Sequence, residues 1–113
     1  MSCIFCKIVK GDIPSQKVFE NEVVLAFNDI QPKAPVHILV IPKKHIGNIL
    51  NLNEEEIALS QELTKAIGKI VESSGIKESG FRVVTNTGPD SGQEVDHLHF
   101  HILGGRKLSW PPG

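Results

Sequence analysis

Cysteine, aromatic residues and long apolar runs are scarce in this sequence. It has two cysteines among 113 residues, together with five Phe, one Trp and no Tyr. The longest uninterrupted apolar run, residues 23–27, is far shorter than the roughly 20 residues that a membrane-spanning helix needs. A disulfide scaffold and a transmembrane segment are therefore not expected. The hydrophobic content of 40% is typical of a globular domain that buries a core without cross-links.

An excess of charge of either sign is also absent. Lys and Arg number 12 against 13 Asp and Glu, which gives a net charge of −1. Proteins that bind nucleic acid by neutralising its phosphates concentrate positive charge on one surface, so this balance argues against a nucleic-acid partner. Small phosphorylated ligands remain compatible with it. Because no repeat or linker divides the chain, we expect residues 1–113 to form a single domain.

The N-terminal segment carries a C-x-x-C pair, Cys3 and Cys6. Residues 1–10 offer neither the apolar block nor the cleavage site of a signal peptide, so we expect a soluble cytoplasmic protein with no membrane partner. Since the reducing cytosol disfavours structural disulfides, the pair indicates metal or redox chemistry. The spacing alone does not distinguish between the two.

The pattern of apolar residues predicts an α+β fold. Residues 4–9 are expected to form a short helix ended by Gly11, and residues 17–20 and 23–29 the two strands of a hairpin. Residues 36–41 form a third strand, which Pro42 ends. Residues 81–86 and 96–103 are the fourth and fifth strands, separated by the Gly- and Pro-rich segment 87–93. We expect a five-stranded antiparallel sheet with one short and one long helix.

The long helix is predicted from its N-cap and its apolar stripe. Asn53 is the expected N-cap, with Glu56 as its partner in a capping box, and Gly75 is the expected stop. A stripe of this kind packs into a core and carries no function. Its members are Leu59, Leu63, Ala66, Ile67, Ile70 and Val71.

Three of the five histidines alternate along the last predicted strand. His97, His99 and His101 are separated by single apolar residues. Because successive side chains of a strand point to opposite faces, the three imidazoles should share one face, each about 6.5–7 Å from the next. A single histidine on a strand is most often structural, but three in strict alternation favour a functional site.

Three interpretations of these histidines compete. Paired imidazoles on a strand can chelate zinc. One imidazole can instead act as a nucleophile while a neighbour or a backbone carbonyl holds the proton on its far nitrogen. The third interpretation is inert packing. A nucleophile that attacks phosphate needs an anion cradle, and residues 86–93, with Gly88 and Gly92, can offer backbone N–H groups or can simply form a turn. Their position directly before the histidines favours the cradle.

The histidine segment resembles the His-x-His-x-His signature of the histidine triad (HIT) superfamily. The third histidine distinguishes the chain from the uridylyltransferase branch, which carries Gln there, and the C-terminal end resembles the Hint branch. Eukaryotic relatives have Ser where this chain has Glu94, a difference that points to a bacterial origin. The matching segments are residues 4–8, 26–30, 35–45, 92–106 and 110–113.

The resemblance implies a purine nucleoside phosphoramidase that cleaves the P–N bond of AMP– or GMP–amine conjugates. By resemblance, His99 attacks phosphorus to form a nucleotidyl-histidine, His101 contacts the phosphate, and His37 completes the hydrogen-bond relay behind the nucleophile. His97 belongs to the same catalytic set. An imidazole is both a nucleophile and a good leaving group near neutral pH, so these roles are chemically reasonable. No cofactor is required for this catalysis.

The resemblance also implies the nucleotide pocket. Asp29 would accept hydrogen bonds from the ribose, whereas from the residues alone it is an ordinary turn former. A carboxylate at Glu94 would repel phosphate, so we expect the backbone N–H groups of Glu94 and Val95 to make that contact. The nucleotide-binding residues implied are Ile4, Phe5, Ile8, Phe27, Asp29, Ile30, Asn86, Gly92, Gln93, Glu94, Val95, His99, His101 and Trp110.

Some prokaryotic members of the family hold zinc with residues that match this N-terminal pair and two histidines. The resemblance therefore implies a closed, structural Zn²⁺ site that joins the N-terminal helix to the last strand. Two reduced, idle thiols are the alternative. The implied ligands are Cys3, Cys6, His45 and His97.

The family further implies a homodimer with a continuous sheet. Residues 106–113, which would otherwise be a disordered tail, are expected to reach the partner subunit near the active site. Two other functions remain open: hydrolysis of dinucleoside polyphosphates, and a nucleotide-binding scaffold with incidental turnover. A catalytic metalloenzyme is a further alternative.

Overall fold

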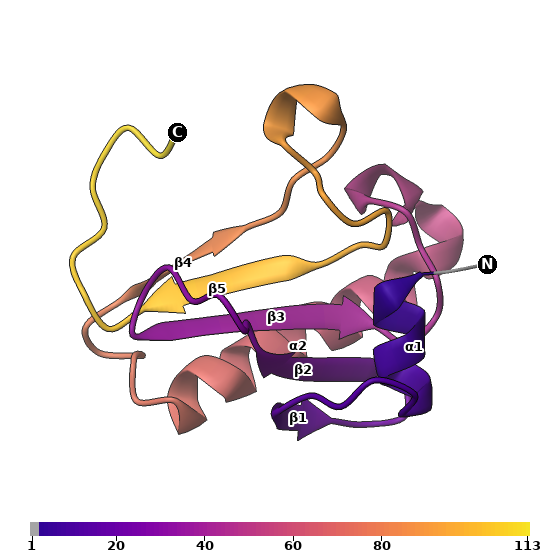
Figure 1. The fold of residues 1–113 in the computed structure, drawn as a ribbon, viewed down its shortest axis with the longest axis horizontal. Coiled ribbons are helices and arrows are strands. Elements are labelled where there is room, and N and C mark those ends of the chain that lie inside the picture. Colours follow the sequence, from indigo (N-terminus) through magenta and orange to yellow (C-terminus); the bar gives the residue numbers. More distant parts are fainter. Residues whose placement is uncertain (1–2) are drawn as a thin grey trace.

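A computed structural model describes residues 3–113. It contains one five-stranded antiparallel sheet with the strand order β1-β2-β3-β5-β4. The two α-helices lie on opposite faces of this sheet, with α1 in front of it and α2 behind it in Figure 1. The elements are α1 (Ile4–Lys10), β1 (Lys17–Glu20), β2 (Val24–Asn28), β3 (Val36–Pro42), α2 (Ile57–Ser73), β4 (Phe81–Val84) and β5 (Phe100–Gly104).

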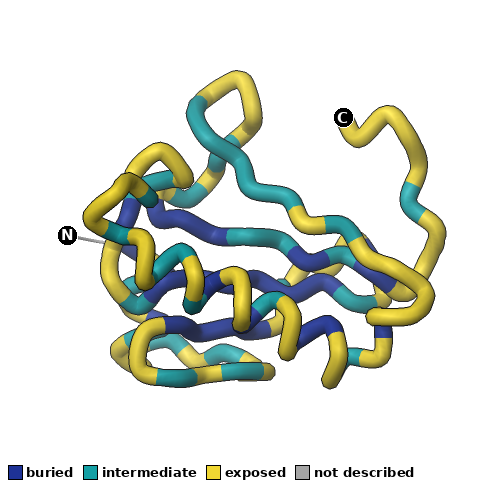
Figure 2. Tube along the Cα trace, turned by 180° about the vertical axis from the view of Figure 1, so that it is seen from behind, coloured by how far each residue is buried: buried dark blue, intermediate teal, exposed yellow. Residues whose placement is uncertain are grey.

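The alternation of side chains along the central strands divides the core into two layers. On β2, Val24 and Ala26 pack toward α2, whereas Leu25 and Phe27 pack toward α1. Residues of β3 alternate in the same way, because each strand sends successive side chains to opposite faces. Figure 2 shows these central strands largely buried, with exposed loops around them. The predicted α+β fold is confirmed.

Helix α2 buries its predicted stripe against the sheet. Leu63, Ala66, Ile70 and Val71 are buried there, and the remaining members pack against them. The predicted capping box is wrong: the Asn53 side chain accepts the Glu55 N–H and caps a short 3₁₀ turn, and α2 begins only at Ile57. Neither helix in residues 3–113 combines the length and apolarity needed to cross a bilayer.

Among the described residues, α1 is the only helix that covers its face of the sheet, and both of its ends are capped. The Cys3 thiol accepts the Cys6 N–H at the start. Gly11 ends the helix with φ of 84°, a left-handed conformation that glycine adopts without strain. A helix of this length is marginal by itself, so the packing of Phe5 and Ile8 against β2 and β3 holds it in place.

The predicted strand over residues 96–103 starts later than expected. Strand β5 begins at Phe100, where Val40 of β3 is its partner, and β4 reaches only as far as His101. His97 and His99 therefore precede the paired region. Their backbone carbonyls are bonded to side chains instead: Thr85 Oγ1 donates to His99 O, and His99 Nδ1 donates to His97 O.

Candidate active site and metal centre

A cleft of about 590 Å³ opens on the α1 side of the sheet. Its walls come from α1, the end of β2, the segment before β5 and the strand β5 itself. Most of the predicted nucleotide-binding residues line it, but Gln93 and Trp110 do not. Those that line it are Ile4, Phe5, Ile8, Phe27, Asp29, Ile30, Asn86, Gly92, Glu94, Val95, His99 and His101.

His99 lies in the cleft with one of its two ring nitrogens already bonded. Its Nδ1 is 2.7 Å from the backbone oxygen of His97. A carbonyl oxygen only accepts, so Nδ1 must carry the proton. In the neutral ring the lone pair is then on Nε2, which is the form that an attacking imidazole requires.

His101 has the opposite arrangement because His37 stands behind it. The Lys33 amide donates to His37 Nδ1 at 3.0 Å, which leaves the proton of the neutral His37 ring on Nε2. That nitrogen lies 2.9 Å from His101 Nδ1 and donates to it. His101 therefore carries its own proton on Nε2. A lone pair on His99 and an N–H donor on His101 thus stand side by side, with ring centroids 5.1 Å apart.

Burial keeps the rings of His37 and His101 neutral. Desolvation, together with the charges of His99 and His37, lowers the pKa of His101 to about 4. Desolvation also lowers the pKa of His37, although the Asp29 carboxylate, 3.4 Å from its Nε2, acts in the opposite direction. At pH 7 neither ring is an imidazolium, which agrees with the hydrogen-bond pattern.

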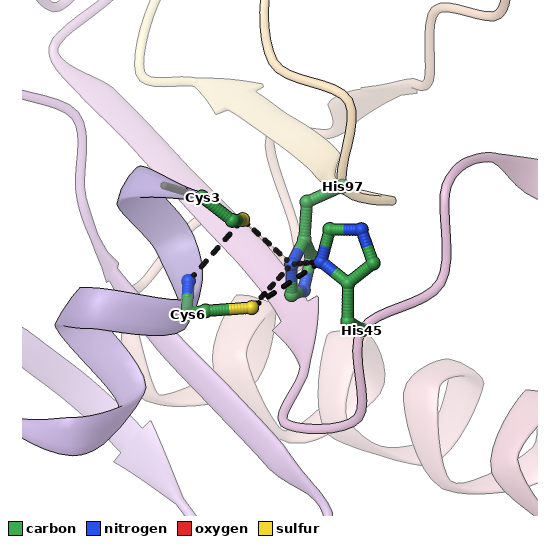
Figure 3. Close-up of side chains that lie close together, drawn as sticks. All are labelled: Cys3, Cys6, His45 and His97. Carbon is green, nitrogen blue, oxygen red and sulfur yellow. Dashed lines mark hydrogen bonds between the residues drawn. The ribbon is translucent and has the colours of Figure 1, made fainter. Parts of the chain in front are cut away.

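The His97 ring does not line the cleft, although it lies on the same face of the sheet as His99, where the Phe5 ring contacts both. The His97 ring is fully buried and turns toward the N-terminus of α1. His97 Nε2 donates to the backbone oxygen of Pro42 at 2.9 Å. Its Nδ1 therefore has a free lone pair, which faces the two thiols and His45 (Figure 3). His97 is connected to the cleft through its carbonyl, which accepts the Nδ1–H of His99.

Cys3, Cys6, His45 and His97, which we call the Cys/His cluster, have donor-atom spacings close to those of a tetrahedral metal site. Cys3 Sγ is 3.3 Å and His45 Nδ1 is 3.2 Å from His97 Nδ1, and Cys6 Sγ is 3.2 Å from His45 Nδ1. All four donor atoms lie within 4.8 Å of one another. The edges of a zinc tetrahedron are about 3.4 Å between nitrogens and about 3.6 Å between sulfur and nitrogen. The cluster could therefore hold a metal ion.

The composition of the Cys/His cluster also fits a metal. Desolvation and the neighbouring Cys3 thiol raise the pKa of the Cys6 thiol. A bound cation favours thiolates in such a place, so binding would release protons. Two sulfurs and two imidazole nitrogens are the donors of closed structural zinc sites.

Comparison with known proteins identifies the family. The HIT domain matches residues 10–108. The chain belongs to the HIT family. A HIT-like protein of Synechococcus elongatus is 51% identical over 110 residues, which cover 97% of this chain and 96% of that protein. One from Helicobacter pylori is 50% identical over 104 residues, covering 92% and 97%.

Solved HIT structures have the same fold. A histidine triad protein from Clostridium difficile has a TM-score of 0.92 and 51% identity, covering 96% of this chain and 95% of that one. A HIT family hydrolase from Legionella pneumophila has a TM-score of 0.96 and 46% identity, covering 99% and 100%. These relatives are bacterial, consistent with the predicted bacterial origin and Hint-branch assignment.

In this HIT domain, three amides of the expected anion cradle are bonded within the loop itself. The Gly88 N–H is taken by the Gln93 side chain, the Gly92 N–H by Pro89 O, and the Gln93 N–H by Gly88 O. Positive φ angles at both glycines serve this internally bonded turn. Within residues 3–113, no acceptor is bonded to the amides of Glu94 and Val95, so these two remain the candidates for an anion.

Gln93 has other surroundings than those expected, and Trp110 lies outside this chain's own cleft. The Gln93 amide donates to Gly47 O and Val95 O, which braces the loop. The Trp110 ring is 79% exposed, with the Arg82 guanidinium 5.9 Å from its centroid. Of the tail, Pro112 reaches the cleft.

The sequence reasoning missed several residues of the HIT cleft. Lys33 lines the cleft, and its amide N–H donates to His37 Nδ1. The segment 13–15, which follows α1, forms another part of the wall. No periodicity marks these loop residues, but the proline at position 14 and the bend near Pro32 indicated turns. The cleft is built where those turns meet the sheet.

Proposed function

We propose that this protein hydrolyses purine nucleoside phosphoramidates through a nucleotidyl-His99 intermediate. The observation that carries the proposal is the pairing of a free Nε2 lone pair on His99 with an N–H donor on His101, in one cleft. The name of the Legionella relative, a HIT family hydrolase, supports hydrolysis in general. The P–N bond and the purine are the finer parts of the proposal.

The reaction proceeds in two displacements. His99 Nε2 attacks phosphorus, a P–N bond forms to the ring, and the bond to the amine breaks. Nδ1–H stays bonded to His97 O and shares the positive charge that the ring acquires. Because His37 and His101 are neutral, the proton that the amine needs arrives with the substrate nitrogen or with water. Water then attacks phosphorus and the bond to His99 Nε2 breaks, which releases the nucleotide and neutral His99; one proton of the water stays on the nucleotide and the other passes to solvent.

The base and ribose have matching surroundings in the cleft. Phe5, Ile8 and Phe27 provide buried apolar surface for a purine. The Asp29 carboxylate accepts the Gln31 N–H and contacts His37. A carboxylate has about four acceptor positions, so at least two remain for ribose hydroxyls.

We also infer that the Cys/His cluster holds Zn²⁺ in a structural role. Bound there, the metal would fix α1 to the segments that carry His45 and His97, and no catalytic step involves it. Metal analysis of the purified protein should give one zinc per chain, and Cys6→Ser should lower that content. Full zinc content in the variant would argue against this ligand set.

We further propose a cytoplasmic homodimer in which residues 106–113 approach the partner's cleft. The exposed Trp110 ring supports this, since a large aromatic side chain gains stability from burial. So do Phe81 and Val83, which stand exposed on the edge strand β4.

Intact-mass analysis after rapid quench tests the covalent path. Mixed with an adenosine phosphoramidate, the wild-type protein should gain the mass of one adenylyl group transiently, and His99→Ala should show neither adduct nor turnover. Ile70→Val, a conservative core change on the other face of the sheet, is the matched control and should behave as wild type. Parallel reactions with a diadenosine polyphosphate distinguish the alternative hydrolase.

Normal turnover in His99→Ala would refute the proposed nucleophile. Faster turnover of the polyphosphate than of the phosphoramidate would refute the proposed substrate class while leaving the nucleophile in place.

A further inference from the structure

The peptide unit between His97 and Leu98 connects the Cys/His cluster to the cleft. Its carbonyl oxygen accepts the Nδ1–H of His99. Its N–H, on the opposite side of the same planar unit, donates to the backbone oxygen of Ile46. The orientation of this one plane therefore determines which nitrogen of His99 carries the proton.

Regular sheet pairing does not fix this peptide. Strand β5 is paired from Phe100 onward, and β3 ends at Pro42. Three contacts hold the segment instead: the buried Leu98 side chain, the bond from the His97 ring to Pro42 O, and the bond to Ile46 O.

Two of the four cluster residues adjoin the atoms that hold the peptide. His97 supplies the carbonyl itself, and His45 directly precedes Ile46, whose oxygen holds the N–H side. The side chains of both histidines meet in the cluster with Nδ1 atoms 3.2 Å apart. The same cluster thus restrains both chain segments that fix the peptide plane.

Helix α1 adds a second connection. Phe5 lies between the two cysteines in the sequence, and its ring packs edge-on against His97 and His99, with centroid distances of 5.8 and 5.1 Å. Cys3 and Cys6 anchor the helix on the cluster side. A shift of the cluster would therefore also move a ring that touches the nucleophile.

We propose that the Cys/His cluster positions the nucleophile: by fixing the 97–98 peptide plane, it holds the proton of His99 on Nδ1 and leaves Nε2 free to attack. His45, Cys3 and Cys6 are positioning residues in this sense, because within the described chain His45 and the two cysteines do not line the cleft. This inference rests on the proposed role of His99 and deepens it.

The variants His45→Ala and Cys6→Ser test the coupling, with Ile70→Val as the matched control for lost stability. Two-bond ¹H–¹⁵N correlation spectra of the histidine rings report which nitrogen of His99 carries the proton. In wild type we expect the Nδ1–H form, and in both cluster variants a mixture of the two neutral forms. Steady-state kinetics on the phosphoramidate should show kcat lowered about 10- to 100-fold, with little change in KM.

A chelator gives a second perturbation of the folded wild-type protein. Removal of bound zinc should shift the His99 spectrum in the same direction as His45→Ala, and zinc added back should restore it. Because this measurement uses the wild-type protein, it does not depend on how well a variant folds. Far-ultraviolet circular dichroism verifies that the wild-type fold persists after zinc is removed.

Wild-type kcat and an unchanged His99 spectrum in folded cluster variants would refute the coupling and leave a merely structural cluster. That result differs from failure of the proposed function, in which wild-type protein itself forms no nucleotidyl adduct. A mixed His99 spectrum already present in the zinc-loaded wild type would also refute the proposal.

Discussion

Replacing His37 with Phe tests whether the hydrogen bond behind His101 is needed. The His37 side chain is only 4% exposed, and Phe keeps a ring in that buried position. The change removes the donor to His101 Nδ1 and the acceptor of the Lys33 amide N–H. A buried polar atom left without its partner costs about 1–3 kcal/mol. Because Lys33 is an exposed residue, we expect water to replace the partner of its amide, so that His101 accounts for most of the loss. We expect about 1–2 kcal/mol, or a Tm lower by about 5–10 °C.

The same change should also lower kcat, and by more than the loss of stability would explain. Without the His37 donor, the His101 proton divides between its two nitrogens, and Nε2 presents a lone pair to the phosphoryl oxygens part of the time. Loss of a full transition-state donor lowers kcat about 10²- to 10³-fold, so we expect a decrease of at least about 10-fold here. Thermal unfolding and phosphoramidate kinetics measure the two effects separately.

Ile102→Val is the matched control for His37→Phe. Ile102 is buried on the opposite face of β5 and toward α2, and this truncation costs about 0.5–1.5 kcal/mol. It should lower Tm without lowering kcat. If His37→Phe lowered Tm but kept the kcat of the control, the proposed relay from His37 to His101 would have no catalytic role.

Two further predictions concern stability. The pKa of His37 is lowered by folding, and that of His101 is lowered to about 4. Below pH 6.5 the unfolded chain therefore binds protons that the folded chain does not bind. The contribution of these two histidines to the free energy of unfolding is complete above pH 6.5 and is lost as the pH falls toward 4. Urea unfolding should have a lower midpoint at pH 5 than at pH 7, and equal midpoints would contradict this. Gly105→Ala should destabilise by about 1–3 kcal/mol, because φ is 89° and the new Cβ would lie 2.8 Å from Pro35 Cβ. Gly11→Ala, with φ of 84° and no atom within 4 Å, should cost less, and equal losses of Tm would exclude the steric contribution.

The sequence predicted the parts of the fold that depend on periodicity. The stripe of α2 and the apolar runs of β2 and β3 have periods of 3.6 and 2, and burial follows those periods directly. The start of β5 was misplaced because a strand needs partners as well as a pattern. Residues 97–99 lie beyond the paired parts of β3 and β4, so they remain outside the ladder despite their strand-like pattern.

The loop before the histidines shows a second limit of sequence reasoning. The position of Gly88 and Gly92 favoured an anion cradle over a simple turn, but whether their N–H groups face a ligand depends on which acceptors lie nearby. Gln93 folds back on Gly88 and, together with the turn itself, uses these donors. A side chain that bonds its own loop leaves no trace in composition or spacing.

The histidine spacing explains why three identical side chains acquire three different surroundings. In an extended chain, alternate residues point to one face, but each faces a different part of the neighbouring strand. His101 lies within the paired region, diagonal to His37 on β3, and bonds to it. Two residues earlier, His99 has passed the last pair of the ladder, so its ring bonds to its own backbone and stays accessible from the cleft. Two residues earlier again, His97 lies beyond the end of β3 and meets Pro42 O and the cysteines of α1. The element opposite each histidine, and not its place in the motif, therefore determines its chemistry.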